Sequence, residues 1–305
     1  GVIEEVGADV TGLAVGDKVV LGFSSCGACP RCDEGLPSYC QSFVPMNYAG
    51  VRLDDGSTAY SAGEEQVGSH FFGQSSFAAS AIVRARNVVK VGDTSAPLEL
   101  LGPLGCGFQT GAGGVMRSLA CTAGSSIAIF GGGPVGLAAV MGAAIQGCST
   151  IILVEPIAAR RAIAQDLGAT HVIDPATAGD LTEALRAILP AGVDYAFDTT
   201  GNVGVIEAGL AALGSHGAIG LVGVPKQADA SFSVNIAALM TPGLRIIGII
   251  EGDSDPQDFI PELLAHHAAG RFPFDRLITT FALADINKAV AAQAKGECIK
   301  VVLIP

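Results

Sequence analysis

Residues 125–155 constrain the fold of this chain more than any other stretch. An apolar run at 127–130 is typical of a buried parallel strand. The letters Gly-Gly-Gly-Pro-Val-Gly follow at 131–136, and an Ala-rich segment at 137–146 is typical of a helix. A second apolar run fills residues 150–154. This order of strand, glycine turn, helix and strand predicts a βαβ unit.

Each glycine of the resulting G-x-G-x-x-G pattern has its own physical role. Gly131 permits a tight turn, Gly133 leaves room for a pyrophosphate at the backbone, and Gly136 lets helix and strand pack closely. The helix N-terminus offers free N–H groups and a partial positive charge to phosphates. We therefore predict a dinucleotide site here, with a purely structural glycine turn as the alternative.

An acidic residue ends the second strand of this unit. The Glu155 carboxylate would accept hydrogen bonds from ribose hydroxyls and repel a 2′-phosphate, which favours NAD over NADP. Arg160 and Arg161 follow within two helical turns, and either guanidinium would weaken that preference. Arg160 is included among the predicted cofactor-binding residues.

A membrane span is the competing interpretation of this region. Residues 118–154 carry no charged side chain and are long enough to cross a bilayer. The internal Gly-Gly-Gly-Pro would break such a helix, however, and strand-like and helix-like segments keep alternating as far as residue 250. We predict the α/β class instead, with a Rossmann doubly wound parallel sheet and ligands at the carboxyl ends of its strands.

The length and net charge of the chain limit the classes of function that it can have. The 305 residues are enough for about two domains, and half of them are hydrophobic. A net charge of −12 argues against nucleic-acid binding. With no secretory or lipidation signal in sight, we expect a cytoplasmic protein that has no membrane partner.

Four cysteines lie within fifteen residues in the spacing C-x2-C-x2-C-x7-C. They are Cys26, Cys29, Cys32 and Cys40. Four thiolates so close together can surround one tetrahedral Zn²⁺ and leave no open position, as in structural zinc sites. An Fe–S cluster, two disulfides and four unrelated thiols are the alternatives.

The other cysteines and the aromatic pair at 71–72 are ambiguous from the residues alone. Cys106 stands alone among glycines, and a lone cysteine is usually an inert buried residue. The same description is expected to hold for Cys121, Cys148 and Cys298. Phe71 and Phe72 follow His70, and core packing explains them as well as a substrate pocket does.

Taken in order, these motifs resemble the zinc-dependent medium-chain alcohol dehydrogenases. A four-cysteine lobe, a Gly-Cys-Gly-Phe-x-Thr-Gly segment at 105–111 and the nucleotide unit follow one another. Segments 26–40, 70–77, 104–113 and 296–304 look closest to the aryl-alcohol (benzyl alcohol) branch. The resemblance covers the whole chain.

The resemblance implies an architecture and a reaction. A β-rich GroES-like catalytic domain would occupy residues 1–107, a Rossmann domain 108–250, and a return to the catalytic domain 251–305. The activity implied is NAD-dependent oxidation of aromatic or allylic primary alcohols to aldehydes, in a homodimer or homotetramer. A non-catalytic, zinc-stabilised NAD-binding module and a dehydrogenase for polyols or other alcohols are the alternatives.

The resemblance also assigns roles to single residues. Cys106 matches a cysteine ligand of the catalytic zinc, and Phe71 and Phe72 match substrate-pocket positions, where aromatic rings would suit an aryl or allylic alcohol. Positions that contact the nicotinamide ring, its carboxamide or the pyrophosphate are matched by Thr110, Val135, Val222 and Lys300.

One departure from the family pattern concerns the catalytic zinc. The family has a further cysteine, a hydroxyl–histidine proton relay and a Gly-His-Glu motif before the stretch that matches residues 1–4, and this sequence has none of them. A catalytic zinc needs three protein ligands, of which only Cys106 is recognisable. The expectation is an N-terminally truncated dehydrogenase that is inactive by itself.

Overall fold

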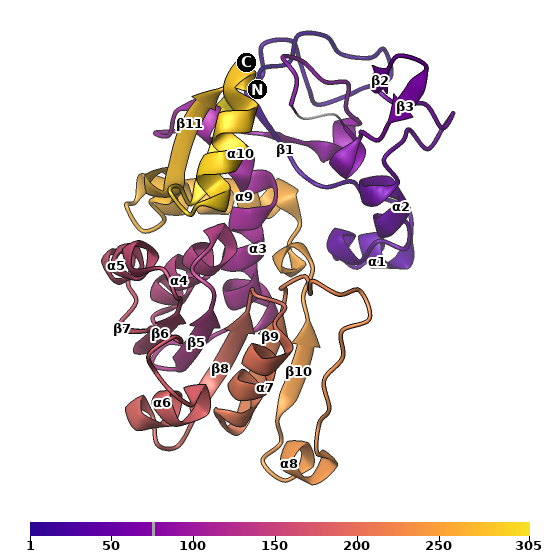
Figure 1. The fold of residues 1–305 in the computed structure, drawn as a ribbon. Coiled ribbons are helices and arrows are strands. Elements are labelled where there is room, and N and C mark those ends of the chain that lie inside the picture. Colours follow the sequence, from indigo (N-terminus) through magenta and orange to yellow (C-terminus); the bar gives the residue numbers. More distant parts are fainter. Residues whose placement is uncertain (75–76) are drawn as a thin grey trace. The chain divides into compact units, whose positions relative to one another are not determined.

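The computed structural model describes residues 1–74 and 77–305, which form two compact units. Unit 1 comprises Gly1–Cys106, Ser254–Gly270 and Phe274–Pro305, and unit 2 comprises Gly107–Asp253 and Arg271–Pro273. Figure 1 shows the elements of both. Except for Lys300, the predicted cofactor-binding residues lie in unit 2, and the four-cysteine lobe lies in unit 1. Each unit is described by itself.

Unit 2 is built on a six-stranded parallel sheet in the order β10-β9-β8-β5-β6-β7. The strand bounds are β5 Ser126–Phe130, β6 Thr150–Val154, β7 His171–Ile173, β8 Val193–Asp198, β9 Leu213–Leu221 and β10 Arg245–Gly248. The chain runs outward from β5 to β7, then returns to place β8 on the other side of β5. The topological switch point therefore lies between β5 and β8, where Phe130 pairs with Asp198.

Helices cover the sheet of unit 2 on both faces (Figure 1). Their bounds are α3 Gly107–Gly113, α4 Pro134–Gln146, α5 Ala158–Asp166, α6 Leu181–Ile188, α7 Val203–Ala211 and α8 Ile236–Met240. Buried residues of α6 and α7 pack on the face that carries Ala128 and Phe130. On the other face, a Cβ on Gly114 would lie 2.4 Å from the ring of Phe197, so the backbone at Gly114 packs closely against this strand. A sheet buried on both faces explains why its strands read as continuous apolar runs.

Unit 1 contains short strands and short helices around the four-cysteine lobe. Its sheets have two strands each, pairing β1 Val19–Leu21 with β4 Val88–Lys90, β2 Tyr60–Ala62 with β3 Glu65–Val67, and β11 Ile278–Ala282 with β12 Lys300–Ile304. Its helices are α1 Pro30–Asp33, α2 Phe43–Tyr48, α9 Pro256–Ala268 and α10 Ile286–Ala294. The segment after residue 253 thus contributes two helices and two strands to the unit that contains the N-terminus.

The predicted α/β class and the parallel sheet are confirmed, and some boundaries differ. The strand-like pattern at 78–91 yields only β4, because much of 77–86 is exposed and too little of it packs against a core. In the described part of the chain no helix is long and apolar enough to cross a membrane, so the apolar stretch 118–154 forms sheet and helix of unit 2.

Candidate functional site

The glycine turn joins β5 to α4 at the carboxyl edge of the sheet. Gly131 has a φ of +95°, a conformation that L side chains rarely adopt. A Cβ on Gly136 would lie 1.8 Å from the carbonyl oxygen of Gly131, so only glycine allows this approach of helix and strand. At Gly133, the N-cap of α4, a Cβ would meet open space. That opening at a helix N-terminus is what a bound pyrophosphate requires.

Glu155 lies directly beside this turn. Its side chain is buried, and its Oε2 accepts a hydrogen bond of 2.6 Å from the N–H of Gly132. Its Oε1 accepts a second bond, of 2.8 Å, from the N–H of Ile157. The two bonds hold the carboxylate at the end of β6, next to the turn that would hold a pyrophosphate.

The two arginines after Glu155 differ in their surroundings. Arg161 donates to the carbonyl oxygens of Glu155 and Pro156 at 2.7 and 2.8 Å and forms an ion pair of 3.0 Å with Asp174. It is therefore engaged within unit 2. The Nε of Arg160 is buried and has no hydrogen-bond partner among the described residues, so this guanidinium retains capacity for a ligand.

The loop after β8 completes the carboxyl edge of the switch point. The hydroxyl of Thr199 donates to the carbonyl oxygen of Phe130 at 2.7 Å, which ties this loop to the end of β5. Asp198 is fully buried and accepts bonds from the N–H groups of Thr200 and Gly201 at 3.1 and 2.9 Å. The N–H of Val222 donates to the carbonyl oxygen of Asp198 at 3.0 Å. The end of β5 and the segment with Val222 are thus bound to the same loop.

Thr110 and Val135 also belong to unit 2. Val135 lies in the first turn of α4. A Cβ on Gly111 of α3 would lie 2.0 Å from the carbonyl oxygen of Val135, so α3 and α4 approach closely here. The hydroxyl of Thr110 donates to the carboxylate of Glu251 at 3.4 Å, and Gln109 donates to the same oxygen at 3.2 Å. Glu251 is buried and was not predicted, because about 140 residues separate it from α3 and no local motif marks it.

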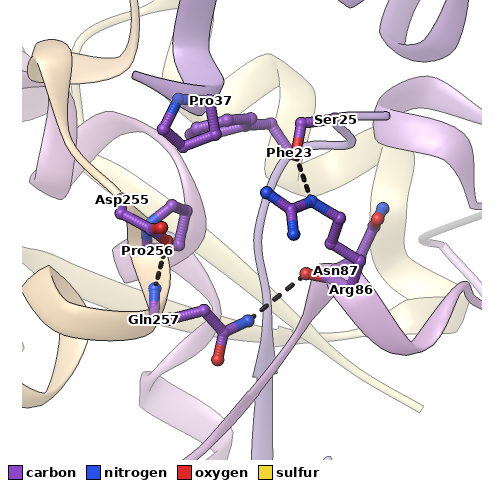
Figure 2. A pocket seen from close by; sticks show the side chains of 8 residues that line it. All are labelled: Phe23, Ser25, Pro37, Arg86, Asn87, Asp255, Pro256 and Gln257. Atoms are coloured by element: carbon purple, nitrogen blue, oxygen red, sulfur yellow. Dashed lines mark hydrogen bonds between the residues drawn. The ribbon is translucent and has the colours of Figure 1, made fainter. Parts of the chain in front are cut away.

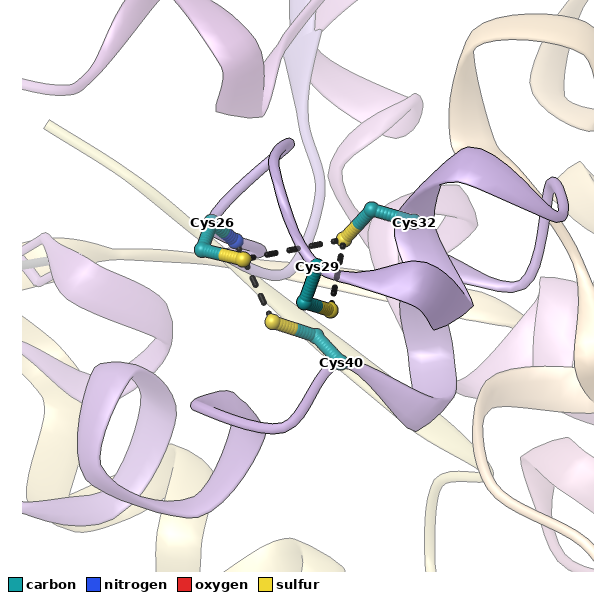
Figure 3. A group of neighbouring side chains, drawn as sticks. All are labelled: Cys26, Cys29, Cys32 and Cys40. Carbon is teal, nitrogen blue, oxygen red and sulfur yellow. Dashed lines mark hydrogen bonds between the residues drawn. The ribbon is translucent and has the colours of Figure 1, made fainter.

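The four cysteines of unit 1 converge on one point, as Figure 3 shows. Their sulfur atoms all lie within 4.8 Å of one another. Cys29 and Cys26 each approach Cys32, with Sγ–Sγ distances of 3.7 and 4.0 Å. Zn–S bonds of about 2.3 Å in a tetrahedron place sulfur atoms about 3.8 Å apart, so the four thiols can hold one Zn²⁺ with little movement.

Two cysteines of this cluster differ in how readily they ionise. Backbone N–H groups of Gln41 and Cys32 donate to the sulfur of Cys29 and lower its pKa to about 6. Burial raises the pKa of Cys40 to about 11. Because thiolates, not thiols, are the ligands of Zn²⁺, a bound ion would hold both sulfur atoms in the deprotonated form.

An aromatic cluster joins the cysteine lobe to the predicted substrate residues. Buried Phe23, Phe43 and Phe72 pack with Cys29 and Cys40, and half-buried Cys106 packs against the same cluster. The structure therefore brings Cys106 and Phe72 together within unit 1.

The two predicted pocket phenylalanines have opposite environments. Phe72 is 5% exposed and belongs to the core, whereas Phe71 is 54% exposed. Their rings are stacked with centroids 4.4 Å apart, and the ring of Tyr48 lies beside both, at 5.6 Å from Phe71 and 6.3 Å from Phe72. His70 and Phe72 both have positive φ, which turns the chain so that only the ring of Phe71 faces out. The predicted segment 70–77 also includes Ser75 and Ser76, which lie outside the described residues.

Two cavities lie away from the predicted site residues, although Phe23 of the aromatic cluster lines the smaller one. The cavity in Figure 2 has about 30 Å³, room for one water, and lies in unit 1 where Gln257 donates to the carbonyl oxygen of Arg86 at 3.3 Å. A larger cavity of about 520 Å³ lies in unit 2 between α6, α7 and residues 233–244. It adjoins Leu213 at the amino end of β9, opposite the edge where open α/β sheets bind ligands.

Two of the cysteines expected to be inert lie in neighbouring segments of unit 2. Nε2 of Gln146 donates to the carbonyl oxygen of Cys121 at 2.9 Å, and the sulfur of Cys148 lies 3.5 Å from the hydroxyl oxygen of Ser125. Cys121 is buried and Cys148 is half-buried, and their inertness stays a prediction. Cys298 is buried in unit 1. Lys300 begins β12 there, and its contact with a pyrophosphate stays a prediction.

Comparisons with known proteins agree with this geometry. The chain matches the family "Alcohol dehydrogenase GroES-like domain" over residues 1–93 and the family "Zinc-binding dehydrogenase" over residues 134–268. It is 47% identical to a geraniol dehydrogenase from Castellaniella defragrans over 304 residues, 100% of this chain and 81% of that protein.

Solved structures give the same result. The crystal structure of benzyl alcohol dehydrogenase from Acinetobacter calcoaceticus superposes with a TM-score of 0.93 at 41% identity, over 99% of this chain and 81% of that one. A putative zinc-binding dehydrogenase from Sinorhizobium meliloti, solved with NADP, gives a TM-score of 0.78 at 25% identity, over 100% and 81%.

The fold is of the α/β class with a Rossmann-like parallel sheet, and four cysteines of unit 1 are placed so that they could hold a metal ion. The chain belongs to the zinc-binding medium-chain alcohol dehydrogenase family, as its motifs predicted, and is an enzyme of the alcohol dehydrogenase type.

Replacing Cys40 with serine tests the metal centre. We expect Cys40→Ser to lower bound zinc, measured by plasma mass spectrometry, from about one per chain to near zero, because a closed structural site needs four ligands. The free energy of unfolding should fall by at least about 3 kcal/mol, since metal binding is coupled to folding. Cys298→Ser is the matched control and should retain zinc. Iron with sulfide in the wild type, or full zinc in Cys40→Ser, would contradict this assignment.

Proposed function

We propose that this protein oxidises aromatic or allylic primary alcohols to aldehydes with NAD as the hydride acceptor. The observation that carries the cofactor assignment is the buried Glu155 carboxylate, held beside the glycine turn by two backbone N–H groups. A fixed negative charge at the end of β6 suits ribose hydroxyls and opposes a 2′-phosphate. Arg161, already paired with Asp174, supplies no free charge to offset it.

Apart from Lys300, the other cofactor contacts are proposed from their placement in unit 2. Gly131, Gly133 and Gly136 would admit the pyrophosphate at the start of α4. Arg160 of α5, whose Nε has no hydrogen-bond partner among the described residues, would contact the cofactor near Glu155. Thr110, Val135 and Val222 would surround the nicotinamide end. The buried carboxylate of Glu251 would position Thr110 by accepting its hydroxyl proton. Lys300 is proposed to contact the pyrophosphate.

The substrate assignment depends on the aromatic residues of unit 1. The exposed ring of Phe71, backed by Phe72 and flanked by Tyr48, offers a flat apolar surface that suits an aryl or allylic group. The relatives that act on geraniol and on benzyl alcohol have substrates of this chemistry by name. We propose the same substrate class for this chain.

Two metal roles must be separated. We propose that Cys26, Cys29, Cys32 and Cys40 hold a structural Zn²⁺. For a catalytic zinc, which would polarise the alcohol oxygen, this chain offers Cys106; the four-cysteine group is the only metal-binding cluster of three or more such side chains in residues 1–74 and 77–305. One ligand does not make a catalytic site, so no step is derived through that metal.

A second candidate function follows from the same observation. A nucleotide-binding, zinc-stabilised module without catalysis needs the glycine turn, Glu155 and the four cysteines, but no second metal. This module differs from the proposed dehydrogenase in one measurable respect: it would bind NADH but would not oxidise alcohols. The other alternative, a dehydrogenase for polyols or other alcohols, would differ from the proposed enzyme in its substrate profile.

We also propose that the protein is a homodimer or homotetramer. Strand β10 is an edge of the six-stranded sheet, and nearby Ile236 and Met240 are 79% and 71% exposed. An edge strand, together with exposed apolar side chains, favours association with a second copy. A monomeric mass by light scattering at micromolar concentration would overturn this proposal. A reducing compartment, for which we propose the cytoplasm, would keep the zinc thiols reduced.

Replacing Glu155 with glutamine tests the cofactor preference. We expect the ratio of NADH to NADPH affinity to fall about tenfold in Glu155→Gln, equal to about 1.4 kcal/mol, because the charge that repels a 2′-phosphate is lost. Nicotinamide fluorescence measures both affinities without interference, since the chain has no tryptophan. The ratio is taken within one variant, so a general loss of stability cancels. Glu155→Asp is the control and should keep the preference; an unchanged ratio in Glu155→Gln would refute the role of this carboxylate.

Replacing the two phenylalanines separately tests the substrate surface. NADH formation is followed with benzyl alcohol and geraniol. Phe71→Ala should raise KM about tenfold with little change in Tm, because an exposed stacking surface is lost. Phe72→Ala should lower the free energy of unfolding by about 3–5 kcal/mol, because it empties a core position. If NADH binds but no primary alcohol is oxidised, the non-catalytic module is the better description.

A further inference from the structure

Two acidic residues stand at neighbouring strand ends on the carboxyl edge of the sheet in unit 2. Val154 of β6 pairs with Ile173 of β7 in parallel register. Glu155 and Asp174 are the next residues along the two strands. The N–H of Glu155 donates to the carbonyl oxygen of Ile173 at 3.0 Å, so the strands are joined up to this point. The corner where a ribose is proposed to bind therefore has a second acidic residue, which lies outside the βαβ unit.

The side chain of Arg161 contacts both strand ends. It comes from α5, and its Nη1 donates to the carbonyl oxygens of Glu155 and Pro156 at 2.7 and 2.8 Å. Its Nη2 forms an ion pair of 3.0 Å with Oδ2 of Asp174. The two paired side chains are only 17% and 26% exposed, so solvent screens this pair less than it would a pair on the open surface. Three contacts thus hold a guanidinium against the backbone of the residue proposed to select the cofactor.

Asp174 is itself fixed by the turn that follows β7. Its Oδ1 accepts a hydrogen bond of 3.0 Å from the N–H of Ala176, and its carbonyl oxygen accepts one of 3.0 Å from the N–H of Ala178. One carboxylate oxygen is therefore engaged in the turn and the other on Arg161. Because its own turn holds the carboxylate in place, Asp174 is the fixed partner of the pair and Arg161 is the side chain that it restrains.

We propose that Asp174 is a positioning residue that sets the cofactor preference by holding Arg161 away from the ribose position. An arginine near the acidic residue of a dinucleotide unit can accommodate a 2′-phosphate, because its planar guanidinium binds phosphate oxygens in pairs. The guanidinium of Arg161 already reaches the backbone of Glu155, but Asp174 balances its charge and fixes its direction. This role rests on the proposed function, since it concerns the same nucleotide site.

Removing the charge of Asp174 tests this role. The dissociation constants of NADH and NADPH are measured by nicotinamide fluorescence on the zinc-loaded chain, and their ratio is taken within each protein. Asp174→Asn should lower the preference for NADH at least about fivefold, because Arg161 gains an unbalanced charge that attracts a 2′-phosphate. The amide oxygen of asparagine can still accept the bond from Ala176, so the turn is retained.

Removing the charge of Arg161 should have the opposite effect. Arg161→Gln should shift the preference about threefold further toward NADH, because Asp174 is then an unpaired negative charge near the ribose position. In the double variant the preference should return to within about twofold of the wild type, since neither charge is present. Glu207→Gln is the control. Glu207 lines the cavity at the amino end of β9, and its loss should leave the ratio unchanged.

The outcomes separate this role from a purely structural ion pair. A structural pair would weaken NADH and NADPH binding equally, so an unchanged ratio in Asp174→Asn would overturn the proposal. Single variants that shift the ratio in the same direction would also overturn it. If Asp174→Asn fails to fold, Arg161→Gln decides, because its expected shift has the opposite sign. A wild type that binds NADPH as tightly as NADH would count against NAD as the cofactor, whereas the shifts among the variants would still decide the role of Asp174.

Discussion

The close approach of α4 to the end of β5 is the constraint on which unit 2 depends. A side chain at position 136 would overlap the carbonyl oxygen of Gly131, and one at 131 would meet the hydroxyl of Thr199 at 2.5 Å. Two glycines therefore let a helix begin where a strand ends. Because β5 is central in the sheet, this turn sets the position of both neighbouring strands. The opening at Gly133 and the carboxylate of Glu155 follow from the same geometry.

Unit 1 is stabilised in a different way. Its sheets have only two strands each, and its lobe around α1 and α2 consists of short helices and loops. Such segments bury too little apolar surface to be stable alone, and a metal held by four thiolates is the usual remedy. Here the cysteines and the phenylalanine cluster share one core. The candidate metal ligands and the hydrophobic core of this lobe are therefore coupled. The exposed ring of Phe71 stacks on the buried ring of Phe72.

Much of the fold and part of the site could be predicted from local patterns. The glycine turn, the run that ends in Glu155 and the cysteine spacing are each contiguous in sequence, so their geometry follows from backbone rules that act over a few residues. The hydrogen bond between Thr110 and Glu251 escaped prediction. It joins residues far apart along the chain, and no periodicity or motif indicates such a pair.

The sequence by itself determined which residues must be glycine, which thiols can share a metal and where an acidic side chain ends a strand, because steric limits and ligand spacing act locally. Only the tertiary structure decided that Phe71 faces out while Phe72 is buried, and that Thr110 donates to Glu251. It also decided that Arg161 pairs with Asp174 while the Nε of Arg160 lacks a partner among the described residues. These outcomes depend on how sheet, helices and loops pack. Packing depends on contacts among many segments at once, and these contacts cannot be read from a single stretch of sequence.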